Sequence, residues 1–347
     1  MIPEIQMGKR IEAKELRAQQ RQPIQDIVPL STPFVVYIDP TNLCNFRCQF
    51  CPTGDKELLK QVGRPAKSMS FDLFRKIVDD LKSFDQKLKL ASIYKDGEPL
   101  VNKHFPEMIR YLKDADVAER IWTKTNGSLL NPALNQRIAD SGLDMICISV
   151  ESVSREGYKR IADVDIDYDK FRENVMDLYS RRGKTEIYIK IADSGLTQEE
   201  VTKFYSDFQG ISTFIGIEKL MGWSFSEVKD FTLGTNPTTY DGLPLVPKKA
   251  CVYPFYVMAV NSNGSVSVCG NDWSQSTAVG DVTRESLKDI WNCEKLFQFQ
   301  KMMLENRRSE NRACANCYYL QIVPDNIDNY MDQMLKRLYV ARNLVSA

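Results

Sequence analysis

The chain has 347 residues, of which 43% are hydrophobic and 27% charged, the balance of a globular protein. Its 46 basic and 46 acidic residues cancel, so no overall charge attracts nucleic acid or an anionic membrane, and we expect neither as a partner. The first residues lack the apolar core of a signal peptide, and no apolar run reaches membrane-spanning length. The chain has nine cysteines, an odd number, mostly in short metal-type spacings, which favours a cytoplasmic protein over one held by a disulfide framework.

Short β-rich runs alternate with helical periodicity through the first two thirds of the chain. Six strands are expected, at residues 35–38, 88–94, 119–124, 145–150, 186–192 and 214–220. Between them, Ser70 is a plausible helix N-cap, and Thr197 with Glu200 forms a capping box. Six βα units predict an α/β fold of the partial, open (β/α)6 TIM-barrel type, with ligand-binding residues at the carboxyl ends of the strands.

Composition divides the chain further. Residues 233–249 are rich in Gly, Pro, Thr and Asn, which is typical of a connection between domains. We therefore expect a helical N-terminal extension at 1–33, the barrel at 34–232, a small cysteine-rich domain at 233–324 and a C-terminal helix at 325–347. An apolar stripe on that last helix predicts packing onto the body, with a partner surface as the alternative.

Three cysteines follow the first expected strand in a CxxxCxxC spacing: Cys44, Cys48 and Cys51. Three thiolates leave one iron of a 4Fe-4S cluster open to a small molecule, whereas a structural zinc site is normally closed by four protein ligands. With the aromatic Phe50 before the last cysteine, this motif resembles the radical SAM superfamily. The resemblance implies that S-adenosylmethionine binds the open iron, accepts an electron from a flavodoxin or ferredoxin-type donor and yields a 5'-deoxyadenosyl radical that abstracts hydrogen.

Three other strand ends match the same family: the turn Asp96-Gly97-Glu98-Pro99, the tripeptide Thr125-Asn126-Gly127, and Ser149. Relatives commonly carry Gly-Gly-Glu in the first, so an aspartate replaces a glycine here. Taken singly, these are also ordinary turns and a buried strand serine. The resemblance implies a set of residues that contact the cofactor: Phe50, Gly97, Glu98, Pro99, Thr125, Asn126 and Ser149.

A second cysteine set lies in the C-terminal third. Cys251 and Cys269 flank an expected hairpin at 257–268, and the pair Cys314 and Cys317 follows. This part resembles the SPASM or twitch extension of radical SAM enzymes. Full SPASM domains carry seven cysteines, but none follows Cys317, so one auxiliary 4Fe-4S cluster, and two clusters in all, is the better interpretation. A zinc ribbon on the same four thiolates is the alternative.

The two cysteine sets together predict an enzyme, an oxidoreductase acting on a sugar or aminocyclitol-like small molecule. The half-length extension resembles that of radical SAM dehydrogenases acting on 2-deoxy-scyllo-inosamine, in which the auxiliary cluster accepts an electron. An epimerase or a peptide maturase is the runner-up, with Cys147 or Cys293 as candidate hydrogen donors. A non-enzymatic electron-transfer protein leaves the open three-thiolate site unexplained. The sole histidine, His104, is expected to be structural.

Overall fold

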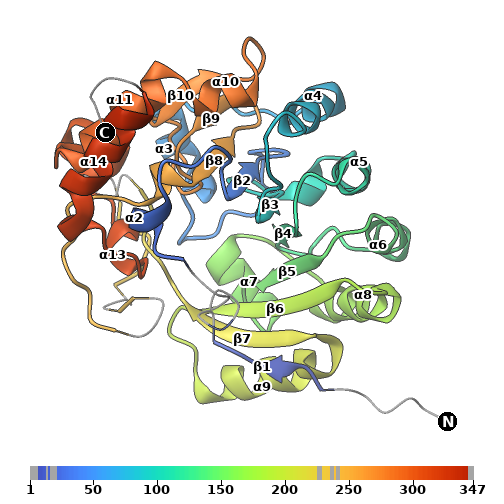
Figure 1. The fold of residues 1–347 in the computed structure, drawn as a ribbon. Coiled ribbons are helices and arrows are strands. Elements are labelled where there is room, and N and C mark those ends of the chain that lie inside the picture. The colour runs from blue at the N-terminus through green and yellow to red at the C-terminus, as the bar shows by residue number, and fades with distance from the viewer. Residues whose placement is uncertain are drawn as a thin grey trace.

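The computed structural model describes residues 7–12, 15, 22–224, 229–234, 238–239 and 243–342. Its strands form one ten-stranded sheet in the order β1-β7-β6-β5-β4-β3-β2-β8-β9-β10 (Figure 1). From β1 to β8 in that order, neighbouring strands are parallel, and the last two pairings are antiparallel. The strands are β1 Lys9–Arg10, β2 Val35–Ile38, β3 Leu90–Ser92, β4 Ile121–Thr125, β5 Met145–Val150, β6 Glu186–Asp193, β7 Phe214–Lys219, β8 Val257–Val260, β9 Ser265–Ser267 and β10 Ala278–Asp281.

The mixed α/β architecture with a parallel sheet is confirmed, and β2 and β5 have the predicted bounds. Helices α4, α5, α6 and α8 lie along the outer side of the sheet (Figure 1). The helices are α2 Ile24–Ile27, α3 Lys56–Gln61, α4 Phe71–Leu81, α5 Phe105–Ala115, α6 Pro132–Ala139, α7 Arg155–Ala162, α8 Tyr168–Arg181, α9 Gln198–Phe208, α10 Leu287–Trp291, α11 Glu294–Leu304, α12 Arg312–Ala315, α13 Tyr319–Ile322 and α14 Met331–Ala341.

Local sequence explains where the helices begin. The Ser70 side chain accepts a hydrogen bond from the Leu73 N–H at the start of α4, and Thr197 with Glu200 closes a capping box at the start of α9, both as predicted. Apolar residues at helical spacing on α4 face the sheet, where Phe74 is fully buried. By packing on the sheet, these helices hold the strands in place, and with them the carboxyl ends at which ligand-binding residues were expected.

The C-terminal part is joined to the barrel more closely than a separate domain would be. Strand β8 pairs in parallel with β2, with Val35 opposite Val257, and turns through Gly264 into the predicted hairpin with β9. This pairing satisfies the backbone groups of β2, which the six-unit barrel leaves as an edge strand. The sequence pattern predicted the hairpin but not its addition to the barrel sheet.

The two ends of the chain differ in how far they match expectation. Residues 1–33 were predicted to be a helical extension, but Lys9–Arg10 form a strand beside β7, and α2 is the helix that follows. The prediction of a helix is wrong for residues 9–10, because the backbone groups at the edge of β7 pair with this segment. Residues 1–6, 13–14 and 16–21 of the predicted extension lie outside the described part. At the other end, Met334 and Leu338 of α14 are buried against Phe297 of α11, as the apolar stripe predicted.

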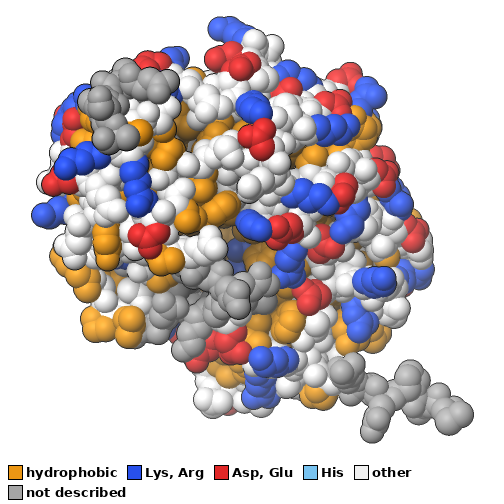
Figure 2. Space-filling view, viewed as in Figure 1, with side chains coloured by type: hydrophobic (Ala, Val, Ile, Leu, Met, Phe, Trp, Pro, Cys, Tyr) orange, Lys and Arg blue, Asp and Glu red, His pale blue; other side chains and the backbone are white. Residues whose placement is uncertain are grey.

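Charges of both signs are intermixed on the face shown in Figure 2, as the balanced composition predicts. Among the described residues, no helix is long and apolar enough to span a bilayer.

Candidate active site

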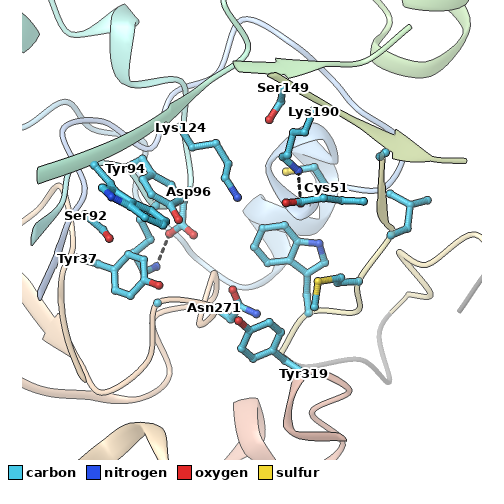
Figure 3. Close-up of a pocket in the computed structure, with 18 of the residues that line it drawn as sticks. Tyr37, Cys51, Ser92, Tyr94, Asp96, Lys124, Ser149, Lys190, Asn271 and Tyr319 are labelled. Atoms are coloured by element: carbon cyan, nitrogen blue, oxygen red, sulfur yellow. Dashed lines mark hydrogen bonds and ion pairs between the residues drawn. The ribbon is translucent and has the colours of Figure 1, made fainter. Parts of the chain in front are cut away.

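A cavity of about 1280 Å³ lies at the carboxyl ends of the barrel strands. The barrel contributes Tyr37, Tyr94, Lys124, Ser149 and Lys190 from five neighbouring strands or the residues that follow them, and the C-terminal part contributes Asn271 and Tyr319 from the opposite side (Figure 3). Figure 3 shows the Lys124 side chain directed toward the middle of this space. The cavity is therefore bounded by both parts of the chain.

The first cysteine set forms one wall. Cys44, Cys48 and Cys51 all line the cavity, and burial raises the pKa of each thiol, that of Cys44 to about 12. Cys51 also raises the pKa of Cys44, and both of these cysteines raise the pKa of Cys48, so the three are electrostatic neighbours. Thiols with such raised pKa values are protonated at neutral pH unless a metal replaces the proton. The donor set thus fits an iron-sulfur cluster held by three soft ligands.

The turn after β3 is tied to the turn after β4 by one carboxylate. Glu98 accepts hydrogen bonds from the Thr125 hydroxyl at 2.5 Å, the Asn126 N–H at 2.7 Å and the Leu100 N–H at 3.0 Å. Asn126 in turn donates to Asn45 Oδ1 at 2.9 Å, within the first cysteine loop. Burial raises the pKa of Glu98 to about 7, against the lowering effect of these bonds. The Glu98 carboxylate therefore joins the turn after β3 to the turn after β4.

Gly97 lies too close to the first cysteine loop to carry a side chain. A Cβ at this position would stand 2.1 Å from the Thr41 carbonyl oxygen and 2.5 Å from that of Leu43. We expect Gly97→Ala to lower the free energy of unfolding by about 3 kcal/mol or more, because backbone on both sides must move. Gly63→Ala is the control: Gly63 has open space around it but φ +69, so alanine there costs only about 1 kcal/mol of backbone strain. Urea unfolding compares the two, and equal losses would contradict the close approach.

The second cysteine set lies behind the opposite wall. Burial raises the pKa of all four thiols, that of Cys251 to about 12, and Cys251, Cys269 and Cys317 each act electrostatically on Cys314. Their neighbours in sequence, Tyr253, Gly270 and Tyr319, line the cavity. Four soft thiolates that are electrostatic neighbours can hold a zinc ion or an iron-sulfur cluster, so this donor set fits an auxiliary cluster by its chemistry.

Charged side chains also face the cavity from β5, β6 and β7. Lys190 pairs with Glu218 at 2.8 Å, and both side chains are less than one fifth exposed. Burial lowers the pKa of Lys190, but Glu218, Cys147 and Glu151 together raise it above its usual value. Burial raises the pKa of Glu151 to about 7, with Lys190 acting in the opposite direction. These residues give the cavity both donors and acceptors.

Glu151 gives the stability of the protein a dependence on pH. Its pKa rises from 4.5 to about 7 on folding, so between these values the folded chain holds a proton that the unfolded chain has lost. Stability therefore falls as pH rises through this window. We expect cluster-free protein to lose up to about 3 kcal/mol more than Glu151→Gln between pH 5 and pH 8, as measured by urea unfolding. The same pH dependence in both proteins would contradict a buried, destabilised Glu151 carboxylate.

The cavity gathers most of the residues predicted from the sequence. Six of the expected cofactor contacts line it: Phe50, Gly97, Glu98, Thr125, Asn126 and Ser149. Pro99 does not; it is buried at the first position of a short 3-10 helix, Pro99–Val101. Cys147 and Cys293 do not line the cavity either, and Cys293 caps α11 by accepting from the Leu296 N–H. His104 stacks on Phe71, which agrees with a structural role.

Several residues that line the cavity were not predicted from the sequence. Tyr37, Tyr94 and Lys124 face inward because alternate residues of a strand share one side, a signal that period-two counting would have found. Trp223 lies on the segment after β7, and its indole N–H donates to the Phe50 carbonyl at 3.0 Å. No local pattern pointed to Trp223, because its partner is far away in the sequence.

Sequence profiles of two families match the chain. That of the Radical SAM superfamily matches residues 38–208, and that of SPASM, an iron-sulfur cluster-binding domain, matches residues 251–318. The S-adenosyl-L-methionine-dependent 2-deoxy-scyllo-inosamine dehydrogenase of Niallia circulans is 19% identical over 299 residues, which cover 86% of this chain and 97% of that protein.

Two solved structures show the same fold. The crystal structure of BtrN in complex with AdoMet and 2-DOIA superposes with a TM-score of 0.52 at 16% identity, covering 85% of this chain and 97% of BtrN. Streptococcus suis SuiB bound to the precursor peptide SuiA superposes with a TM-score of 0.58 at 14% identity, covering 87% of this chain and 73% of SuiB. At these identities the likeness concerns the fold.

Proposed function

Because this chain belongs to the radical SAM superfamily and carries a C-terminal SPASM domain, we propose that it oxidises a small polar ring compound of the sugar or aminocyclitol class. The observation that carries the proposal is the shared cavity: the first cysteine set lines it on one side, and residues adjoining the second set line it on the other. A substrate held there faces both sites at once. An enzyme that removes a hydrogen atom and then an electron needs this arrangement.

Residues of this chain have distinct tasks in the proposal. Cys44, Cys48 and Cys51 hold the cluster that binds S-adenosylmethionine, and the second cysteine set holds an auxiliary cluster. When bound, these groups supply a hydrogen-abstracting radical and an electron acceptor, with the first electron coming from a flavodoxin or ferredoxin-type donor. Four residues that line the cavity position the adenosyl and methionyl parts of the cofactor: Phe50, Thr125, Asn126 and Ser149.

The remaining cavity wall suits a hydroxylated ring. Tyr37 and Tyr94, with ring centroids 5.9 Å apart, offer aromatic surface to the C–H faces of such a ring. Lys124 donates, and the Lys190–Glu218 pair both donates and accepts, which matches hydroxyl or amino substituents. Glu151 and Glu218 are the carboxylates available to take the hydroxyl proton when the carbon is oxidised.

One observation favours a peptide substrate as the second candidate. The cavity volume of about 1280 Å³ exceeds the roughly 300–1,000 Å³ of typical small-ligand sites, although the cofactor occupies part of it. SuiB, whose structure contains a precursor peptide, shares the fold. Epimerisation has less support, because neither candidate hydrogen donor, Cys147 or Cys293, lines the cavity.

Mass spectrometry of products tests the proposal. Reconstituted protein reacts anaerobically in heavy water with reductant, S-adenosylmethionine and a panel of aminocyclitols, sugars and peptides. A product two hydrogens lighter than a ring substrate supports the dehydrogenase. An isomer that has gained one deuterium supports epimerisation, and a modified peptide supports the second candidate, so either of these results overturns the proposal.

A further inference from the structure

The loop that follows Cys269 is attached to the barrel through three consecutive backbone carbonyls. The Ser224 hydroxyl donates to the Asn271 carbonyl at 2.7 Å, the Lys95 ammonium to that of Asp272 at 2.8 Å, and the Arg64 guanidinium to that of Trp273 at 3.5 Å. This loop, residues 270–273, adjoins a ligand of the second cysteine set, and two of its residues line the cavity. Its position is therefore set from the barrel side.

The two cations that hold this loop also support the first site. Arg64 donates to the Asn42 carbonyl at 3.4 Å, two residues before Cys44, and to the Thr53 hydroxyl at 3.2 Å, two residues after Cys51. Thr53 passes the connection on by donating to the Asp96 carbonyl at 2.6 Å. Lys95 directly precedes the turn that contains Gly97 and Glu98. Arg64 thus contacts residues on both sides of the first cysteine set and also the loop that follows Cys269.

Asp96 makes this arrangement possible. Its carboxylate lies 2.6 Å from Lys95 Nζ (dashed in Figure 3) and 3.6 Å from Arg64 Nη1, and the three side chains are at most 2% exposed. Two buried cations without a counter-charge are strongly unfavourable. Asp39, also buried, acts on the same charges, but within the described part of the chain it is Asp96 whose carboxylate lies within ion-pair distance of both cations. A glycine at position 96 would supply no such charge.

We propose that Asp96 is a positioning residue that couples the two cysteine sites. By neutralising Lys95 and Arg64 while they bind the loop at 270–273, it fixes that loop against the turn at 96–99 and so sets the width of the substrate cavity. Charge-assisted hydrogen bonds with buried partners allow little displacement, so a change at one site reaches the other. The inference rests on the proposed function only in assigning clusters to the two sites.

A double-mutant cycle on cofactor affinity tests the coupling. The Kd of S-adenosylmethionine is measured by equilibrium dialysis on anaerobically reconstituted protein carrying Cys269→Ala, Asp96→Gly, or both. We expect each single change to weaken binding about fivefold, and the double variant to be no weaker than either, because both act through the same loop. Independent effects that multiply in the double variant would overturn the proposal.

Two further variants separate positioning from folding. Lys95→Met combined with Asp96→Gly removes one buried cation together with its partner and leaves Arg64 near the buried Asp39, so the charges stay balanced if Asp96→Gly alone does not fold; Lys95→Met alone measures what the lost bond to the Asp272 carbonyl contributes. Asp116→Gly is the matched control, an exposed aspartate that pairs with Lys87 and has φ 52, which glycine tolerates. Amide hydrogen exchange at residues 270–277 should rise about tenfold in the Asp96 variants and stay unchanged in the control. Unchanged exchange in the Asp96 variants contradicts the inference, whereas failure of the wild-type protein to bind S-adenosylmethionine contradicts the proposed function instead.

Discussion

Alanine at Cys44, Cys48 or Cys51 lowers reductive cleavage of S-adenosylmethionine to background in each variant, which is the largest effect that we expect. Each change removes one of three thiolates that line the cavity, and with it the ligand set of the electron source for cleavage. The three thiols are half-buried electrostatic neighbours at one wall of the cavity, so the loss of any one of them opens the same site. The measurement is 5'-deoxyadenosine formed by dithionite-reduced, reconstituted protein.

Cys293→Ala is the control for this series. Its thiol is a helix N-cap outside the cavity, so cleavage should persist while stability falls by about 1 kcal/mol. Normal cleavage in all three variants of the first set would refute the assignment of the site.

Alanine at Cys314 or Cys317 separates two activities that the first set loses together. Both cysteines are half-buried near Cys251, and neither lines the cavity, whereas Tyr319 beside them does. We expect product formation to fall to background while cleavage continues at saturating S-adenosylmethionine, because the second set acts on the substrate and affects the cofactor only by weakening its binding through the loop at 270–273. The readout is the ratio of 5'-deoxyadenosine to product in the same reaction.

The alternatives for the second set give different results. Equal loss of cleavage and product would mean that these cysteines support folding. Metal analysis of the wild-type protein adds a second criterion, since zinc at this set would favour the zinc ribbon, whereas iron and sulfide for two clusters would exclude it.

Much of the barrel could be predicted because its signals are local. The β-rich run at 145–150 predicted the strand with its observed bounds, and the family resemblance, carried by short local motifs, pointed to Ser149, which lines the cavity. The cysteine spacings and the Asn263-Gly264 turn are equally local. Each of these features depends on residues within a few positions of one another, so periodicity and turn chemistry were enough.

The features that escaped prediction depend on distant partners. The parallel pairing of β8 with β2 joins residues more than two hundred positions apart, and β1 pairs with β7 across a similar distance. In the sequence Asp96 is only an aspartate in place of a family glycine, whereas in the structure it is buried between Lys95 and Arg64, and Lys95 donates to the Asp272 carbonyl. Periodicity in the sequence does not predict such contacts, because their partners become neighbours only when the chain has folded.

Deuterium transfer is the most direct test of the central claim, that a ring substrate bound between the two cysteine sites loses a hydrogen atom to the cofactor-derived radical. Aminocyclitols and sugars deuterated on their ring carbons are incubated with reduced, reconstituted protein, and 5'-deoxyadenosine is analysed by mass spectrometry. We predict 5'-deoxyadenosine carrying one deuterium, in step with a product that has lost one ring deuterium and one proton from the attached hydroxyl or amino group. Unlabelled 5'-deoxyadenosine with every ring substrate, or label that appears only with deuterated peptides, would contradict the account.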